Sequence, residues 1–83
     1  MEMSDAVVMG WINTGNRRYY RALLQPDLFG DWTLMRSWGS LDNARGQVHI
    51  EPVSDPAAGK QAIAAIHKRR LAHGYLPLPD RPT

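Results

Sequence analysis

The chain contains no cysteine. Disulfide bonds and thiolate metal sites are therefore excluded, and a reducing compartment is expected. Long apolar runs are also missing, because residues 6–9 fall far short of the about 20 apolar residues that a membrane-spanning helix needs. Residues 1–5 are polar and acidic, unlike the start of a signal peptide. We expect a cytoplasmic protein without a membrane partner.

A strong excess of charge is absent as well. Ten Lys and Arg residues stand against eight Asp and Glu residues, for a formal net charge of +2. Such a mild excess permits nucleic-acid binding but does not require it. The bases are nevertheless clustered, at residues 17–21 and at residues 68–70, whereas the acids are scattered singly. A solvated strand edge and a solvated helix end are the simpler interpretation of these two clusters.

Catalytic groups are few. The imidazoles are His49, His67 and His73, and the last two are six residues apart, which places them on different faces of a helix. Five of the seven glycines, at positions 10, 15, 30, 39 and 46, are isolated at the ends of expected strands and in turns, so no glycine-rich phosphate loop is present. The sequence therefore predicts a protein that is not an enzyme, with no catalytic residues, metal site, cofactor or small-molecule substrate.

The length and the hydrophobic pattern predict one small domain. A chain of 83 residues can hardly form two cores that each bury enough surface. We expect a core from about residue 7 to residue 78, a short polar N-terminus and a proline-rich C-terminal tail. Turn-forming residues separate four candidate strands. These strands are residues 7–12, predicted as an edge strand, and residues 17–25, 30–39 and 46–51.

Alternation assigns faces within two of these strands. In the third, Trp32, Leu34, Arg36 and Trp38 share one side because strand side chains alternate with a period of two. In the fourth, the two apolar residues of 46–51, at positions 48 and 50, are expected to point inward.

A single helix is predicted after the strands, from about Pro56 to His73. Asp55 is a good N-cap, and Pro56 suits the first helical position because its missing N–H is not needed there. Gly74 is a typical C-terminal stop. The fold class is therefore α+β, with a small antiparallel sheet packed against one helix near the C-terminus.

Five short motifs occur in a fixed order along the chain. They are Asn-Arg-Arg-Tyr-Tyr at 16–20, Trp-Gly at 38–39, Arg-Gly-Gln at 45–47, an Ala and an Ile at 62 and 66, and Gly-Tyr at 74–75. Their order and spacing resemble the WGR domain of the DNA-dependent poly(ADP-ribose) polymerases and of small bacterial proteins. The tripeptide here ends in Ser40 instead of arginine, and Leu41-Asp42 replaces the usual Ile-Gly. Arg70 matches a common lysine of the family, whose role is structural or in DNA contact.

This resemblance implies binding to DNA at ends or breaks. In the family, the tryptophan and arginine of the tripeptide meet the DNA there, so Trp38 is a candidate for stacking on a terminal sugar or base. A position in the core is the alternative for Trp38. Ser40 cannot neutralise a phosphate, so binding should be weak unless a nearby arginine supplies the charge. The candidate DNA-binding residues are Arg17, Arg18, Arg36, Trp38, Gly39, Ser40 and Arg45.

A protein-interaction or dimerisation module is the competing function. Such a module would use the sheet and its tryptophans to hold a protein partner or a second copy of the chain. Trp11, Trp32 and Trp38 are natural anchors if they are exposed, because aromatic residues are enriched at interface hot spots.

Overall fold

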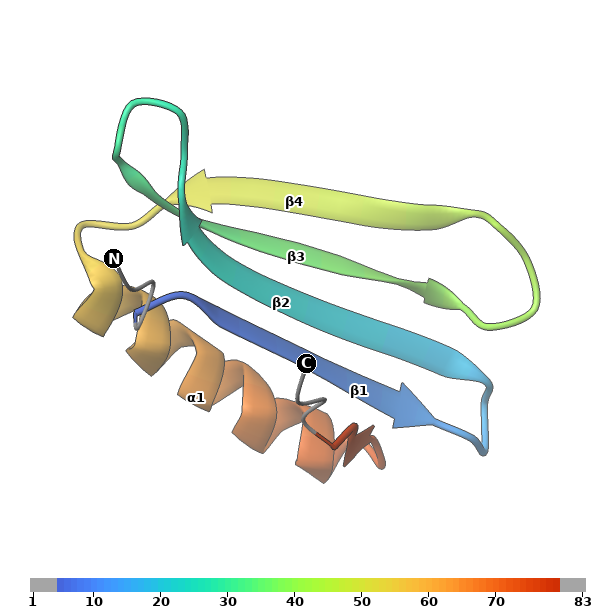
Figure 1. Ribbon diagram of the computed structural model, residues 1–83. Helices are drawn as coiled ribbons and strands as arrows, with labels where there is room; N and C mark the ends of the chain where they lie inside the picture. Colours follow the sequence, from blue (N-terminus) through green and yellow to red (C-terminus); the bar gives the residue numbers. More distant parts are fainter. Residues whose placement is uncertain (1–4, 80–83) are drawn as a thin grey trace.

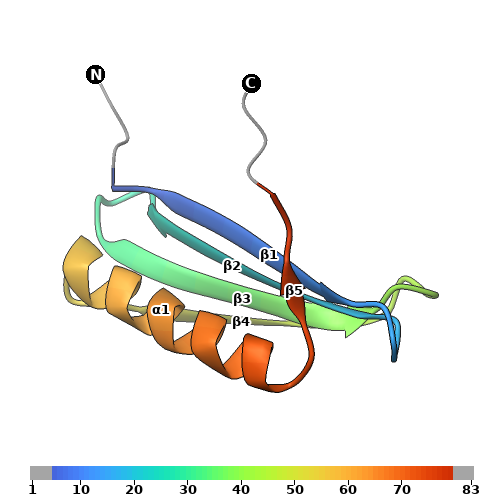
Figure 2. The same cartoon turned by 90° about the horizontal axis from the view of Figure 1, so that it is seen from below.

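The computed structural model describes residues 5–79 and contains a five-stranded antiparallel sheet with one helix on one face (Figures 1 and 2). The predicted α+β class is confirmed. Most of the predicted polar N-terminus and the end of the proline-rich tail lie outside the described residues. The elements are β1 (Val7–Asn13), β2 (Arg18–Pro26), β3 (Trp32–Ser40), β4 (Gly46–Pro52), α1 (Pro56–Ala72) and β5 (Leu76–Pro77).

The strand order is β4-β3-β2-β1-β5. The prediction that the first strand lies at an edge is wrong, because β5 pairs with β1 through Trp11 with Pro77 and Ile12 with Leu76. After α1, the chain returns along β1 as Figure 2 shows. The edges of the sheet are therefore β4 and the two-residue β5.

The two faces of the sheet carry different side chains. On the face that α1 covers, Trp11, Tyr20 and Trp38 form one row across three neighbouring strands. On the opposite face, which we call the open face, Val8, Leu23, Met35 and Ile50 form a row across four strands. Figure 2 shows α1 on one side of the sheet only.

The prediction that Val48 and Ile50 point inward is wrong. Both side chains lie on the open face and are 62% and 61% exposed. Alternation in the sequence separates the two sides of a strand but does not say which side a distant helix covers. In β4, the residues on the side of α1 are polar, namely Gln47, His49 and Glu51.

The helix begins and ends as the sequence predicts. The Asp55 carboxylate accepts a hydrogen bond from the Ala58 N–H at 2.8 Å, which satisfies one of the free amides of the first turn. Gly74 has a φ of +87°, a conformation that favours glycine and stops the helix. α1 is neither long nor apolar enough to cross a membrane.

The core lies between α1 and the first three strands. Trp11, Leu24 and Leu34 are almost completely buried there, and Ile63 covers them from the helix. The Trp11 Nε1–H donates a hydrogen bond to His67 Nδ1 at 3.0 Å, so His67 has a structural role. Trp11 is fully buried, so the exposure that a partner anchor requires is not met at this position.

At Gly59, α1 lies close against the side chain of Leu24 on β2. A Cβ at this position would overlap the side chain of Leu24, which is itself fully buried. We therefore expect Gly59→Ala to destabilise the domain, because overpacking costs about 1–3 kcal/mol and exceeds the gain of about 1 kcal/mol in helix propensity. Urea unfolding followed by circular dichroism measures the change. The control Gln61→Ala, at an exposed position, should be close to neutral. A Gly59→Ala variant more stable than the wild type would contradict this packing.

Candidate nucleic-acid interface

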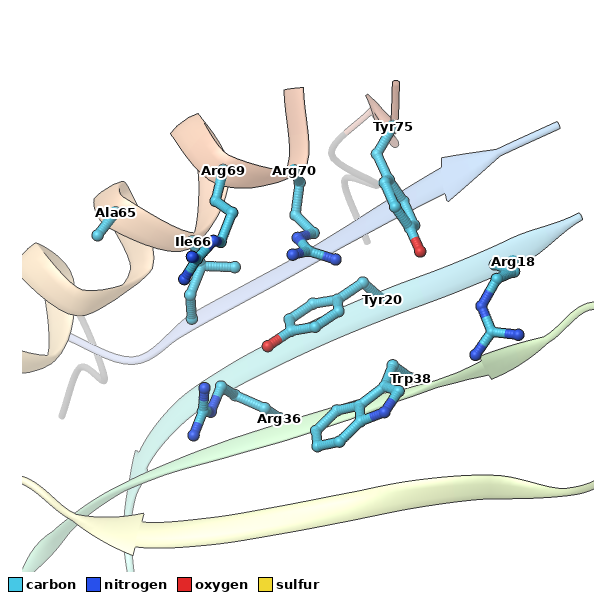
Figure 3. Close-up of a pocket in the computed structure, with 9 residues that line it drawn as sticks. All are labelled: Arg18, Tyr20, Arg36, Trp38, Ala65, Ile66, Arg69, Arg70 and Tyr75. Atoms are coloured by element: carbon cyan, nitrogen blue, oxygen red, sulfur yellow. The ribbon is translucent and has the colours of Figure 1, made fainter. Parts of the chain in front are cut away.

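A hollow of about 500 Å³ lies on the helix side of the sheet, between α1 and strands β2 and β3 (Figure 3). We call it the basic hollow, because four arginines and no acidic residue line it within residues 5–79. Its lining residues are Arg18, Tyr20, Arg36, Trp38, Ala65, Ile66, Arg69, Arg70 and Tyr75.

Two aromatic rings form the floor of the basic hollow. Tyr20 and Trp38 are directly opposite each other on β2 and β3, with ring centroids 5.7 Å apart and planes 12° from parallel. Tyr20 also meets the edge of Trp11, with centroids 5.9 Å apart, which ties the floor to the core. Trp38 is half-buried. It is therefore neither a buried core residue nor a free one, and its ring borders the hollow (Figure 3).

The arginines reach the hollow from both sides. Arg69 and Arg70 come from the last turn of α1, while Arg18 and Arg36 come from β2 and β3 (Figure 3). The guanidinium carbon of Arg70 lies 4.5 Å from the centroid of the Tyr20 ring and 5.0 Å from that of Tyr75. Contacts of a cation with ring faces are favourable, so the two rings hold Arg70, which has no acidic partner within residues 5–79.

Arg36 is held by an acid that lies outside the lining. Its Nη2 is 3.5 Å from Glu51 Oε1, and the same carboxylate oxygen is 3.0 Å from His49 Nε2. The Nε atoms of Arg36 and Arg70 are both buried without a hydrogen-bond partner among the described residues. In the part of the chain that the structure describes, the guanidinium groups of Arg18, Arg69 and Arg70 have no acidic partner. The electrostatics of the hollow therefore favour an anion.

The predicted site residues fall into two groups. Arg18, Arg36 and Trp38 line the basic hollow, and Ser40 lies opposite Arg18 on the same face. The Ser40 Oγ accepts a hydrogen bond from the Asp42 N–H at 3.0 Å, so it shapes the turn after β3. Arg17, Gly39 and Arg45 are not part of the lining.

Each of these three residues has a local structural role or an exposed position. Arg17 is exposed and its Nε is 2.7 Å from Asp42 Oδ1, so an acid already compensates its charge. Arg45 is exposed in the loop after β3. A Cβ at Gly39 would lie 2.8 Å from the Arg45 carbonyl oxygen and 3.1 Å from the Tyr19 hydroxyl. Gly39 is therefore needed for the close approach of β4 and of Tyr19 on the open face.

Two residues of the site that the sequence did not predict come from the C-terminal part of the chain. A solvated helix end is the sequence-based expectation for residues 68–70, yet Arg69 and Arg70 both line the hollow. They follow Ile66 by three and four residues, and side chains at these spacings share a face of a helix. The position of Ile66 on the apolar face of the helix is thus the sequence feature that indicates that these two arginines point toward the sheet.

Among the described residues, the lining of the hollow contains no Ser, His, Asp or Glu. Within residues 5–79, no three His, Cys, Asp or Glu side chains gather in a way that would hold a metal ion. Four guanidinium groups and three aromatic rings line the hollow, and such groups are suited to contact phosphates and flat rings.

Comparisons with known proteins identify the family. The model of the WGR domain matches residues 6–82. Uncharacterized protein y4dW of Sinorhizobium fredii (strain NBRC 101917 / NGR234) is 29% identical over 65 residues, which cover 78% of this chain and 31% of that protein. The chain thus spans about a third of the length of that relative. No solved structure matches. The chain belongs to the WGR domain family, a module associated with nucleic-acid binding in proteins like the poly(ADP-ribose) polymerases.

Proposed function

We propose that this protein is a non-catalytic module that binds DNA at ends or breaks through the basic hollow. The observation that carries the proposal is the convergence of four arginines and the Tyr20–Trp38 floor in one hollow that no acid of the described residues lines. Arginine side chains bind phosphates, and aromatic rings stack on bases or sugars. We expect this function in the cytoplasm, where bacterial DNA lies.

The shape of the hollow favours an end over the middle of a duplex. A volume of about 500 Å³ suits a ligand of drug size, so it has room for the terminal part of a strand but not for a whole duplex. Bases inside a duplex are stacked on both faces, whereas the last nucleotide presents one free face to Trp38. The guanidinium groups of Arg18, Arg36 and Arg69 then contact the flanking phosphates.

Removal of two arginines from the hollow tests this site. Arg18→Gln together with Arg69→Gln should weaken binding to a short blunt duplex and lower the steepness of its salt dependence. Each phosphate contact contributes a slope of roughly −0.9 in a plot of log affinity against log salt, so the loss of two contacts reduces the slope by about 1.8. Fluorescence anisotropy of a labelled duplex at several salt concentrations measures both quantities. Competition with closed circular DNA tests the preference for ends.

The matched control removes two charges elsewhere. Arg21→Gln with Lys68→Gln changes the net charge equally, but neither residue lines the hollow. We expect this variant to keep most of the affinity and most of the slope. Equal losses of affinity in both double variants would show that DNA binding depends on the net charge of the protein and not on the hollow. If the wild type binds no duplex even at low salt, the DNA proposal is wrong and a protein-interaction module becomes the better explanation.

A further inference from the structure

The open face of the sheet carries a row of apolar side chains between the polar residues Gln25, Thr33 and Ser37. In strands β1 to β4, Arg21 is the only charged side chain on that face. It borders a hollow of about 170 Å³ whose other walls include Val8, Leu23 and Met35. Among the described residues, Leu78 packs beside Gly10 at the β1 margin of this face, while Val8 remains 58% exposed. Contiguous apolar surface of this kind marks an interaction site.

The turn between β2 and β3 presents a second apolar feature. Leu28 and Phe29 at its tip are 99% and 88% exposed. The tip is nevertheless well defined, because the Asp27 carboxylate accepts hydrogen bonds from the N–H groups of Phe29 and Asp31 at 2.8 and 3.0 Å. The Asp27 N–H also donates to the Asp31 carbonyl oxygen at 2.7 Å. Two large apolar side chains are thus exposed to water on an ordered turn. Figure 1 shows the backbone of this turn between β2 and β3.

The tip of the β2–β3 turn and the hollow of the open face are both apolar, and the charges beside them are of opposite sign. Acids flank the apolar tip at positions 27 and 31, whereas Arg21 borders the apolar hollow on the open face. Within residues 5–79, neither Arg21 nor Asp31 forms an ion pair. A negatively charged lipid surface would repel the acids of the tip, and two open faces packed against each other would bring two Arg21 side chains into one apolar interface.

We propose that this protein self-associates head to tail, with Leu28 and Phe29 of one copy seated in the hollow of the open face of the next, beside Arg21. The contact is heterologous, so each copy keeps one free tip and one free face, and association continues beyond the dimer. A tip of two side chains is small beside the roughly 1,200–2,000 Å² of a stable interface, so the association is weak and depends strongly on concentration.

Sedimentation velocity of the full chain without DNA, from about 10 μM to about 1 mM, tests the proposal. The wild type should form dimers and larger species as the concentration rises. Two variants should stay monomeric over the range: a tip variant, Leu28→Ser with Phe29→Ser, and a face variant, Val8→Thr with Arg21→Glu. All four positions are exposed, so the fold is retained. The control Leu41→Ser with Leu71→Ser removes exposed apolar side chains elsewhere and should associate like the wild type.

Mixing the two monomeric variants separates this arrangement from a symmetric one. The intact tip of the face variant fits the intact face of the tip variant, so the mixture should give a 1:1 heterodimer that grows no further. Asp31→Arg alone should weaken association by about tenfold or more, and Arg21→Asp in the same chain should restore it. The proposal is overturned if the wild type stays monomeric, if the tip variant associates like the wild type, or if the mixture contains only monomers.

Discussion

Trp11→Ala should remove a large share of the stability of the domain and lower its melting temperature steeply. Trp11 has no exposed surface, packs against Tyr20, and donates its indole N–H to His67 at 3.0 Å. Truncation of a buried tryptophan costs about 3–5 kcal/mol. The total stability of a domain is about 0.05–0.15 kcal/mol per residue, so a chain of this length has only about 4–12 kcal/mol to lose. Thermal unfolding followed by circular dichroism measures the loss.

Trp11→Phe is the matched control for this prediction. Phenylalanine keeps much of the buried ring but lacks the indole N–H, which leaves His67 without its hydrogen-bond donor. The cost should then be nearer to about 1–3 kcal/mol, the range for an unpaired buried polar group, and the variant should still unfold cooperatively. If Trp11→Ala melts within a few degrees of the wild type, the core is not centred on Trp11.

The sequence predicts the fold where local chemistry decides it. The Asp55-Pro56 start, the Gly74 stop and the alternation of Trp32 to Trp38 each depend on residues close together in the chain, and each is confirmed. The errors concern long-range pairing. That β5 joins β1, and that α1 covers β1 to β3 instead of the apolar side of β4, depends on how distant elements pack.

The candidate site is predictable from the sequence only in part, for the same reason. Arg36 and Trp38 lie two residues apart on one strand, so alternation alone places them on the same face. Arg69 and Arg70 join them because of the way α1 packs on the sheet. The close packing of Gly59 against Leu24 helps to set the distance between the helix and the sheet. The spacing of residues along the chain does not show which helix residues will meet which strand residues. For Arg69 and Arg70, the only indication is that they share a helix face with Ile66.

One row of side chains links the core to the site. Trp11, Tyr20 and Trp38 are neighbours across β1, β2 and β3, and burial decreases along the row from Trp11 to Trp38. Trp11 is fully buried, Tyr20 is 9% exposed, and Trp38 borders the basic hollow. The same residue type therefore serves stability at one end of the row and, in our proposal, DNA binding at the other.

Trp38→Ala should accordingly weaken DNA binding far more than it weakens the fold. One base or sugar stacked on one aromatic ring contributes about 1–3 kcal/mol, so affinity for a blunt duplex should fall about 5- to 150-fold. The stability loss should stay below that of Trp11→Ala, because Trp38 is half-buried and its indole N–H has no hydrogen-bond partner among the described side chains. Fluorescence anisotropy gives the affinity, and a thermal melt of the same sample gives the stability.

Trp32→Ala separates a binding role from a packing role. Trp32 lies on the same strand and the same face as Trp38, is also partly buried against the core, and does not line the basic hollow. Both substitutions remove the same side chain from β3, so similar losses of stability are expected. Only Trp38→Ala should reduce the affinity for DNA. Equal affinities of the two variants would show that Trp38 only packs on Tyr20, and the ends of DNA would then have to be recognised by the arginines of the hollow alone.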